Sequence, residues 1–350
     1  MFILTNDEND FTLSRVNQRK KLQKQILIGI GIAALVALVA LFAYSGYAYW
    51  KFINKISEGP NSGSESIETA QRLENQAFAT LIIGLDVREK VMDYNTDVLI
   101  VAILNPETKK STLLSIPRDT KVNIPGHGYS KINATYAIGE QEKRKQERNG
   151  EIPTISGTSL LLQVVSDYLY IPVNHYVFLD FQGFVAMVDQ LGGITVNVDR
   201  YMNYVGDSDG TYINLKPGVQ KLSGKQALDF ARFRLSSDGN DSSDFARNRR
   251  HQEIIRSFVN ELTSLNGLSN IFSILNAAGD HTKVSLSKNE ILPLALKYRD
   301  IKSENIESLK FEGAYWLSPY VIVPDADLER IQMALKERLT VSEEYIKQLK

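Results

Sequence analysis

The chain has 350 residues, with 40 basic and 41 acidic side chains and no cysteine. The lack of cysteine excludes disulfides, thiolate zinc sites and a cysteine nucleophile. A hydrophobic fraction of 43%, with 9% aromatic residues, suffices for a packed core and excludes wholesale disorder. The net charge of −1 gives the chain no overall positive charge that would attract nucleic acid, so we expect no nucleic-acid partner.

Residues 26–50 carry no charge, and residues 26–43 are all Ile, Leu, Val, Ala, Gly or Phe. About 20 apolar residues suffice for a helix to cross a bilayer, and the Tyr and Trp side chains that end this stretch suit the headgroup interface. The basic residues before it are Arg15, Arg19, Lys20, Lys21 and Lys24. The positive-inside rule therefore predicts a single-pass membrane helix with a cytoplasmic N-terminus. A cleaved signal peptide and a buried core helix are the alternatives.

This interpretation divides the chain into four parts. We expect a basic cytoplasmic tail over residues 1–25, the membrane helix over 26–50 and a stalk over 51–77, which is rich in Ser, Gly and Glu. An extracellular catalytic domain is expected over residues 78–345. Residues 1–50 have a net charge of +2 and the remainder −3, as this topology requires.

Short apolar runs predict buried strands, and apolar residues at helical spacing predict helices. The expected strands are residues 78–85, 98–104, 111–116, 175–181, 194–198 and 307–315. The expected helices are residues 160–169, 184–191, 226–233, 244–265, 268–276, 288–298 and 325–338. The charged run 140–150 is typical of a solvated loop or a frayed helix. Because strands and helices alternate, we predict one α/β or α+β domain.

Several common catalytic patterns are absent from the sequence. It has neither His-Glu-x-x-His nor Gly-x-Ser-x-Gly, and its four histidines show no metal-ligand spacing. The run from Gly218 to Gln226 resembles a phosphate loop but has one residue too many between its glycines, so we interpret it as a turn before a helix. Ser285 and Lys288 fit a Ser-x-x-Lys pattern that chance often produces.

Arginine and aspartate cluster where apolar strands and helices begin or end. Arginine pairs bidentately with phosphate, and carboxylates are hard ligands for Mg²⁺. The clusters therefore favour a polyphosphate site, and arginine–aspartate surface salt bridges are the plain alternative. Their members are Asp86 and Arg88; Asp97; Arg118 and Asp119; and Arg232, Arg234, Asp244, Arg247, Arg250 and Gln252.

Six motifs in this order strongly resemble the LytR-CpsA-Psr family. They are LIIGLDVR (81–88), LSIPRDT (114–120), KINA (131–134), VDQLGGI (188–194), LSGKQALDFARFR (222–234) and DFARNRRHQ (244–252). The resemblance implies an extracytoplasmic phosphotransferase that moves a glycopolymer from a polyprenyl-pyrophosphate carrier onto peptidoglycan and releases polyprenyl phosphate. The fold that it implies is an α-β-α sandwich with a central mixed sheet and an apolar tunnel for the prenyl chain.

The resemblance also implies roles for individual residues. The catalytic set would be Arg118, Arg232 and Arg234, which clamp the pyrophosphate, with Asp97 and Asp86. The supporting residues would be Arg88, Lys131, Arg247, Arg250 and Gln252. Mg²⁺, for which Mn²⁺ can substitute, would be held by Asp97, Asp86 and Asp244. Asp86 and Asp244 are also the candidates for a base that accepts the proton of the acceptor hydroxyl.

The sequence departs from the family pattern at two places. Asn95-Thr96 and Val98 flank Asp97, where the family usually has Arg-Ser and Thr, so a contact from that arginine is missing. His251 replaces a usual Gln in the last motif, a change that we interpret as tolerated.

The resemblance implies three partners: a polyprenyl-pyrophosphate-linked glycopolymer such as wall teichoic acid or capsule, a peptidoglycan acceptor, and the cell membrane of a Gram-positive-type bacterium. Two other functions stay open at this point. One is a regulatory protein of the cell envelope, since members of this family were described as transcriptional attenuators. The other is a pyrophosphate hydrolase with water as the acceptor.

We expect protease added to intact protoplasts to digest residues 51–350, because the basic flank before residue 26 keeps the N-terminus in the cytoplasm. Immunoblotting for the domain measures the digestion, and a cytoplasmic protein serves as the control for lysis. Full protection of the domain would contradict the predicted orientation.

Overall fold

The computed structural model describes residues 44, 46–48, 50–51, 53–58, 73, 75–85, 96–206, 211–234, 236–237, 243–264, 271–298 and 301–339. The chain divides into two compact units, Met1–Lys51 and Phe52–Lys350. In the first unit the described residues are helical, and the rings of Tyr47 and Trp50 stack at 6.5 Å. Residues 26–43 of the predicted membrane helix lie outside the described residues. No helix within the described part of the chain is long and apolar enough to cross a membrane.

A six-stranded mixed sheet lies at the centre of the second unit, in the order β11-β6-β1-β2-β3-β12. β1 pairs antiparallel with β2 and parallel with β6, and β3 pairs antiparallel with β2 and parallel with β12. One edge of the sheet, here called the carboxyl edge, therefore gathers the ends of β1, β3, β6 and β12 and the start of β2. The strands are β1 (Phe78–Leu85), β2 (Thr96–Asn105), β3 (Lys110–Ser115), β6 (Val173–Asp180), β11 (Thr282–Val284) and β12 (Ile306–Leu309).

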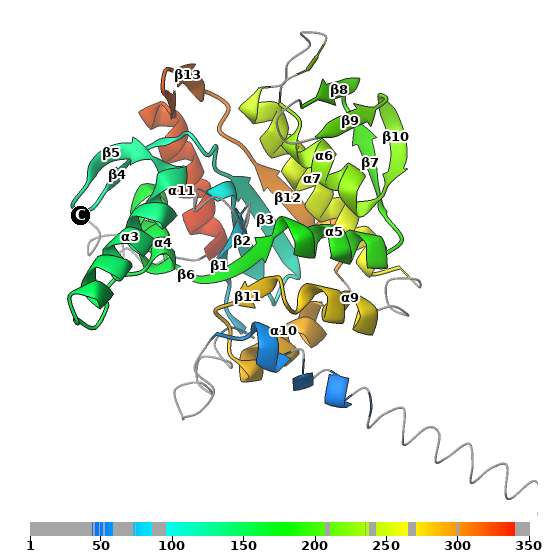
Figure 1. Cartoon of the computed structure of the whole chain (residues 1–350), viewed down its shortest axis with the longest axis horizontal. Helices are drawn as coiled ribbons and strands as arrows, with labels where there is room; N and C mark the ends of the chain where they lie inside the picture. Colours follow the sequence, from blue (N-terminus) through cyan, green and yellow to red (C-terminus); the bar gives the residue numbers. More distant parts are fainter. Residues whose placement is uncertain are drawn as a thin grey trace, which may run out of the picture. The chain divides into compact units, whose positions relative to one another are not determined.

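Helices cover both faces of the sheet, because β2 alternates its apolar side chains between two cores. Leu99 and Val101 pack in the core that α4 and α11 complete, whereas Ile100 and Ala102 pack in the core that α7 covers. Figure 1 shows α3, α4 and α11 on one side of the sheet and α5, α6 and α7 on the other. The predicted α/β fold with a central mixed sheet is confirmed. The helices are α3 (Thr135–Arg148), α4 (Gly157–Leu169), α5 (Phe181–Gln190), α6 (Gly224–Arg232), α7 (Asp244–Leu262), α9 (Ile271–Ala278), α10 (Lys288–Tyr298) and α11 (Asp325–Leu339).

Four pairs of short strands surround this sheet. β7 (Ile194–Val198) pairs with β10 (Gly218–Leu222), and β8 (Met202–Val205) pairs with β9 (Tyr212–Leu215). With α6 and α7 they enclose a second apolar core that contains Phe230 and Phe233. β4 (Lys121–Ile124) pairs with β5 (Gly128–Lys131), and β13 (Tyr315–Leu317) pairs with β14 (Tyr320–Ile322). A bridge between Thr120 and Val321 joins these last two hairpins.

The structure differs from the sequence interpretation at several elements. Of the two alternatives for the run 140–150, the helical one holds, but the helix is longer and begins at Thr135, as α3. The expected strand 307–315 is divided between β12 and the start of β13. The expected turn at Gly218 is strand β10, which pairs with β7. Within the expected stalk, Ile53, Ile56 and Leu73 are buried in the second unit, because they pack under β11 and α10 rather than lie in solvent.

Candidate active site

A chain of alternating charges crosses the carboxyl edge beside β2 and β3. Arg118 Nη1 donates to Asp97 Oδ1 at 2.9 Å, and Arg118 Nε lies 3.6 Å from Asp119 Oδ2. Lys131 Nζ lies 2.8 Å from the other oxygen of Asp119, whose carboxylate is nearly buried. The structure therefore brings Asp97, Arg118 and Lys131 together, as the sequence predicted, and adds Asp119 between them.

The turn after β3 sets the direction of Arg118. Ile116 still donates to Leu99 of β2, and Thr120 closes the turn by donating from both its amide and its hydroxyl to the carbonyl of Pro117. Arg118 is thereby held above the start of β2. Its Nε is buried beside Asp119, whereas its Nη2 donates to no described residue, so the guanidinium retains a donor for an anion.

Arg232 and Arg234 lie at the end of α6. The helix begins at a capping box, in which Ser223 accepts from the amide of Gln226 and donates its own amide to the side chain of Gln226. At its end Phe233 adopts an extended backbone and buries its ring. Arg232 and Arg234 therefore line one pocket of about 180 Å³, as the spacing of two residues allows at a helix end.

Strand register connects the two arginine groups. Leu85, the last residue of β1, pairs with Thr96 of β2 on one side and with Asp180 of β6 on the other. Neighbouring strands are about 4.8 Å apart, so the start of β2 and the end of β6 are about 10 Å apart across β1. Phe181 follows Asp180, and the guanidinium of Arg232 lies 5.3 Å from its ring. The carboxyl edge thus presents Arg118 on one side of β1 and Arg232 on the other.

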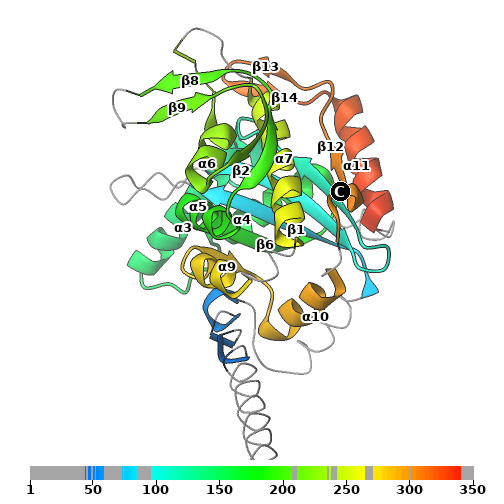
Figure 2. The ribbon, with the colours of Figure 1, turned by 90° about the vertical axis from the view of Figure 1, so that its right-hand side faces the viewer.

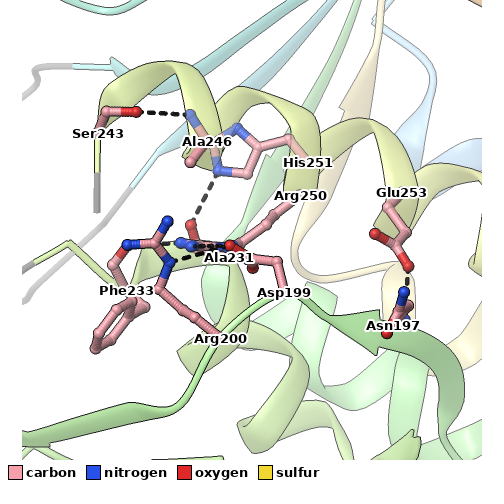
Figure 3. A network of polar contacts seen from close by, with 10 residues as sticks. All are labelled: Asn197, Asp199, Arg200, Ala231, Phe233, Ser243, Ala246, Arg250, His251 and Glu253. Carbon is pink, nitrogen blue, oxygen red and sulfur yellow. Dashed lines mark hydrogen bonds and ion pairs between the residues drawn. The ribbon is translucent and has the colours of Figure 1, made fainter. Parts of the chain in front are cut away.

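Helix α7 makes hydrogen bonds to the segment that carries Arg232 and Arg234 (Figure 3). Arg250 is buried, and its Nε and Nη2 donate to the two oxygens of Asp199 at 2.7 and 2.9 Å. Its Nη1 donates to the carbonyl of Phe233 at 3.0 Å, and its guanidinium lies between the rings of Phe230 and Phe233. Burial would raise the pKa of Asp199, but the hydrogen bonds and charge of Arg250 hold that pKa below its usual value. These contacts give Arg250 a positioning role rather than the expected direct support of a pyrophosphate.

His251 holds the same segment from the next position of α7. Its Nε2 lies 3.2 Å from the carbonyl of Ala231 in the interior, and a carbonyl can only accept, so Nε2 carries a proton and donates it. Burial, together with the charge of Arg247, lowers the pKa of His251 to about 3. The residue that departs from the family pattern therefore donates a structural hydrogen bond that a glutamine amide can also supply.

Gln252 joins α7 to the end of β12 and borders a larger pocket. Its Nε2 donates to the carbonyl of Leu309 at 3.2 Å. The pocket measures about 500 Å³ and lies at the ends of β3 and β12, next to the turn of Arg118. Its size suits a sugar or a phosphate group. It is lined by Ser115, Pro117, Phe245, Asn248, Arg249, Gln252, Leu309, Lys310, Phe311, Glu312 and Ala314.

Part of the predicted set cannot be placed in this arrangement. Asp86 and Arg88 lie outside the described residues, and Asp244 is described only as the first residue of α7. Arg247 is half-buried on the first turns of α7. Among the described residues, no group of three His, Asp or Glu side chains could hold a metal ion.

Two residues that help to build the site, Asp199 and Phe181, were not indicated by any local sequence pattern. Asp199 follows β7, more than 50 residues before its partner Arg250, and no local pattern links the two. Phe181 starts α5 and becomes the stacking partner of Arg232 only through the parallel pairing of β6 with β1. Asp119 did have a signal, because it adjoins Arg118 in the third cluster.

Comparisons with known proteins show which family the chain belongs to and which structures share its fold. The sequence matches the profile of the LytR_cpsA_psr family over residues 47–337. The polyisoprenyl-teichoic acid–peptidoglycan teichoic acid transferase TagU of Enterococcus faecalis is 31% identical over 324 residues, which cover 90% of this chain and 96% of TagU. The crystal structure of B. subtilis TagV superposes with a TM-score of 0.61 at 29% identity, covering 77% of this chain and 99% of TagV. TagT bound to LI-WTA superposes with a TM-score of 0.60 at 25% identity, covering 82% and 97% of the two chains.

We expect His251→Gln to make the protein less sensitive to acid. The unfolded chain binds a proton at His251 near pH 6.5 and the folded chain does not, so the histidine costs stability as the pH falls below that value. Between pH 7 and pH 5, the free energy of unfolding of the wild type should fall by about 2 kcal/mol more than that of the variant. Denaturant unfolding at both pH values measures this difference. The matched control is the exposed His127, whose replacement by Gln should leave the acid sensitivity of the wild type in place; equal slopes for wild type and His251→Gln would contradict the assignment.

Proposed function

The chain belongs to the LytR_cpsA_psr family, and from this premise we propose that it is a membrane-anchored extracellular phosphotransferase of the bacterial cell wall. It would transfer a glycopolymer from a polyprenyl-pyrophosphate carrier to peptidoglycan and release polyprenyl phosphate. The names of TagU and TagV, both teichoic acid transferases, favour wall teichoic acid as the glycopolymer.

The observation that carries this proposal is the pair of arginine groups on either side of β1. A pyrophosphate placed over the end of β1 would meet Arg118 from the β2 side and Arg232 from the β6 side, and Arg234 lines the same pocket as Arg232. Phosphoryl transfer spreads negative charge over the phosphoryl oxygens in the transition state, and fixed guanidinium groups stabilise that charge without a covalent protein nucleophile.

The reaction requires one displacement at phosphorus. A hydroxyl oxygen of a peptidoglycan sugar attacks the phosphorus that carries the glycopolymer, and the bond from this phosphorus to the bridging oxygen breaks. Polyprenyl phosphate leaves with the bridging oxygen, and the hydroxyl proton passes to a base, for which Asp86 and Asp244 are the candidates. The product is a phosphodiester between the glycopolymer and the glycan.

We propose that Asp97 also contributes to a divalent-cation site at the carboxyl edge. Asp97 Oδ1 accepts from Arg118, whereas Oδ2 accepts no hydrogen bond from a described residue and is open to a hard cation. Asp97 would hold Mg²⁺ or Mn²⁺ together with Asp86 and Asp244. When bound, the cation would neutralise charge on the pyrophosphate oxygens.

The two alternative functions lead to different measurements. A hydrolase would consume the lipid-linked donor equally well with and without peptidoglycan, and a regulator would consume none. Turnover of a lipid-linked teichoic acid donor, with and without peptidoglycan, therefore tests the proposal, which requires that donor consumption depends on the acceptor and yields polymer-bearing peptidoglycan.

We expect Arg118→Ala, Arg232→Ala and Arg234→Ala each to lower turnover by about 10²–10³, because each removes a charge-assisted donor to the transition state. The lysine variants should recover little activity, since an ammonium group cannot reproduce the planar fork of arginine. The measurement is turnover of the lipid-linked donor, with thermal melts as the control for folding.

Arg144→Ala and Arg148→Ala provide the matched controls. Both residues lie in the charged run of α3, on the other side of the sheet from α6. They should retain near-normal turnover. If Arg118→Ala and Arg234→Ala also retain it, or if lost activity follows a lowered melting temperature, the arginines serve as structural salt bridges.

We expect Asp97→Asn to lower turnover and to raise the Mg²⁺ concentration needed for half-maximal activity, because a neutral amide binds a hard dication more weakly than a carboxylate. Titrating Mg²⁺ in the turnover assay measures both effects. Asp167→Asn, at an exposed position of α4, is the control. An unchanged Mg²⁺ dependence in Asp97→Asn would remove Asp97 from the metal site.

A further inference from the structure

Aromatic and lysine side chains alternate along the surface of the β4–β5 and β13–β14 hairpins. We call Tyr129, Lys121, Tyr320, Lys131 and Trp316 the aromatic strip. Tyr129 is 69% exposed and Trp316 49% exposed, which is unusual for large apolar rings. Cation–π contacts join Lys121 to Tyr129 and Tyr320, and Lys131 to Trp316, and the pairing of Lys121 with Lys131 connects the two groups. The proposed chemistry gives the three rings no role.

The lysines of the strip hold its rings in place. Lys121 Nζ lies 4.7 Å from the ring centre of Tyr129 and 5.7 Å from that of Tyr320. Lys131 Nζ lies 5.8 Å from the ring centre of Trp316 and also pairs with Asp119. These cation–π contacts fix the rings while much of their surface stays open to solvent.

The β4–β5 hairpin of the strip contains a locally unfavourable pair of charges. Lys121 and Lys131 are directly opposite each other in the antiparallel β4–β5 pair, where like charges destabilise a hairpin. Tyr129 lies two residues from Lys131, so all three side chains share one face of the hairpin. This one like-charged pair, which Asp119 offsets only at Lys131, and the exposed rings on the same face favour a binding surface over a purely structural element.

The strip is connected to the candidate active site. Lys131 binds the carboxylate of Asp119, which adjoins Arg118. Val321, between Tyr320 and the end of β14, donates its amide to the carbonyl of Asp119 at 2.8 Å. A molecule that lies along the strip therefore ends beside the arginine expected to bind the pyrophosphate.

Two observations identify what lies on the strip. The strip offers three ring faces and two ammonium groups, of which that of Lys131 is paired with Asp119, and this combination suits uncharged sugar rings better than a polyanion. Residues 53–58, which follow the predicted membrane segment, pack at β11, and Figures 1 and 2 both place the β13–β14 hairpin at the opposite end of the second unit. The strip therefore suits a wall glycan better than lipid headgroups.

We propose that the aromatic strip binds the sugar rings of a peptidoglycan glycan strand and places its acceptor hydroxyl beside Arg118; this rests on the proposed function, since the strand is the acceptor. The C–H faces of sugar rings pack on the electron-rich faces of Tyr129, Tyr320 and Trp316. The free lysine N–H groups donate to hydroxyl and acyl oxygens.

Binding of the full-length protein in detergent to peptidoglycan sacculi stripped of secondary polymers tests the proposal without any donor. We expect Trp316→Ala and Tyr129→Ala each to weaken co-sedimentation by about 3- to 10-fold, because each removes one stacking face. Trp316→Phe should retain most of the affinity, since it keeps a ring. The control is Tyr212→Ala, an equally exposed aromatic on β9, which should bind sacculi as the wild type does.

Two further arms use the same variants with purified teichoic acid and with anionic phospholipid vesicles. The proposal holds if Trp316→Ala and Tyr129→Ala lose affinity for sacculi alone. It is overturned if sacculi binding is unchanged in both variants, or if the loss appears with teichoic acid or with vesicles instead, which would assign the strip to the donor polymer or to the membrane.

The transfer reaction separates this proposal from the proposed function. In Trp316→Ala we expect a higher KM for the peptidoglycan acceptor and an unchanged rate of transfer at saturating acceptor, because the strip does not touch the reacting phosphorus. If the wild type binds sacculi through the strip but transfers no polymer, the strip is a glycan-binding surface and the proposed function is wrong. If the wild type transfers polymer and the KM of Trp316→Ala is unchanged, the strip is rejected and the function stands.

Discussion

The buried guanidinium of Arg250 fixes the segment on which the candidate active site depends. A buried charge requires a partner, and Asp199 supplies two oxygens while the carbonyl of Phe233 supplies a third acceptor. The backbone that carries Arg232 and Arg234 is thereby tied to both α7 and the end of β7. Arg250 thus serves the structure, and the segment that it holds carries Arg232 to the ring of Phe181 at the carboxyl edge.

The mixed topology of the sheet brings the second half of the site to the same place. An antiparallel β2 begins where the parallel strands β1 and β6 end, so Asp97 and Phe181 come to one edge although they are far apart in the chain. Arg118 reaches this edge from the turn after β3, and Arg232 reaches it from α6. The edge thus collects side chains from four segments around the end of β1.

The direct pair between Arg118 and Asp97 is compatible with both the salt-bridge and the phosphate interpretation. The two side chains are 24% and 34% exposed, and a pair in that environment contributes only about 0–1 kcal/mol to stability. Such a pair can open at little cost when a phosphate or a cation competes for its members. The pair of Arg250 with Asp199 differs because its guanidinium is buried, and it is the structural salt bridge of this region.

The sequence by itself determined five of the six strands of the central sheet, most of the helices that cover it and the family, because apolar periodicity and contiguous motifs are local properties. It did not indicate the short strand β11 or the full helix α3. It also identified Arg118, Arg232 and Arg234, whose spacing from strand and helix ends is visible in the chain. Only the tertiary structure decided that Arg250 faces inward to Asp199, and that the β4–β5 and β13–β14 hairpins join into one aromatic surface. Those outcomes depend on contacts between residues that are 50 to 200 positions apart, and burial and strand register, rather than any local pattern, determine which of them meet.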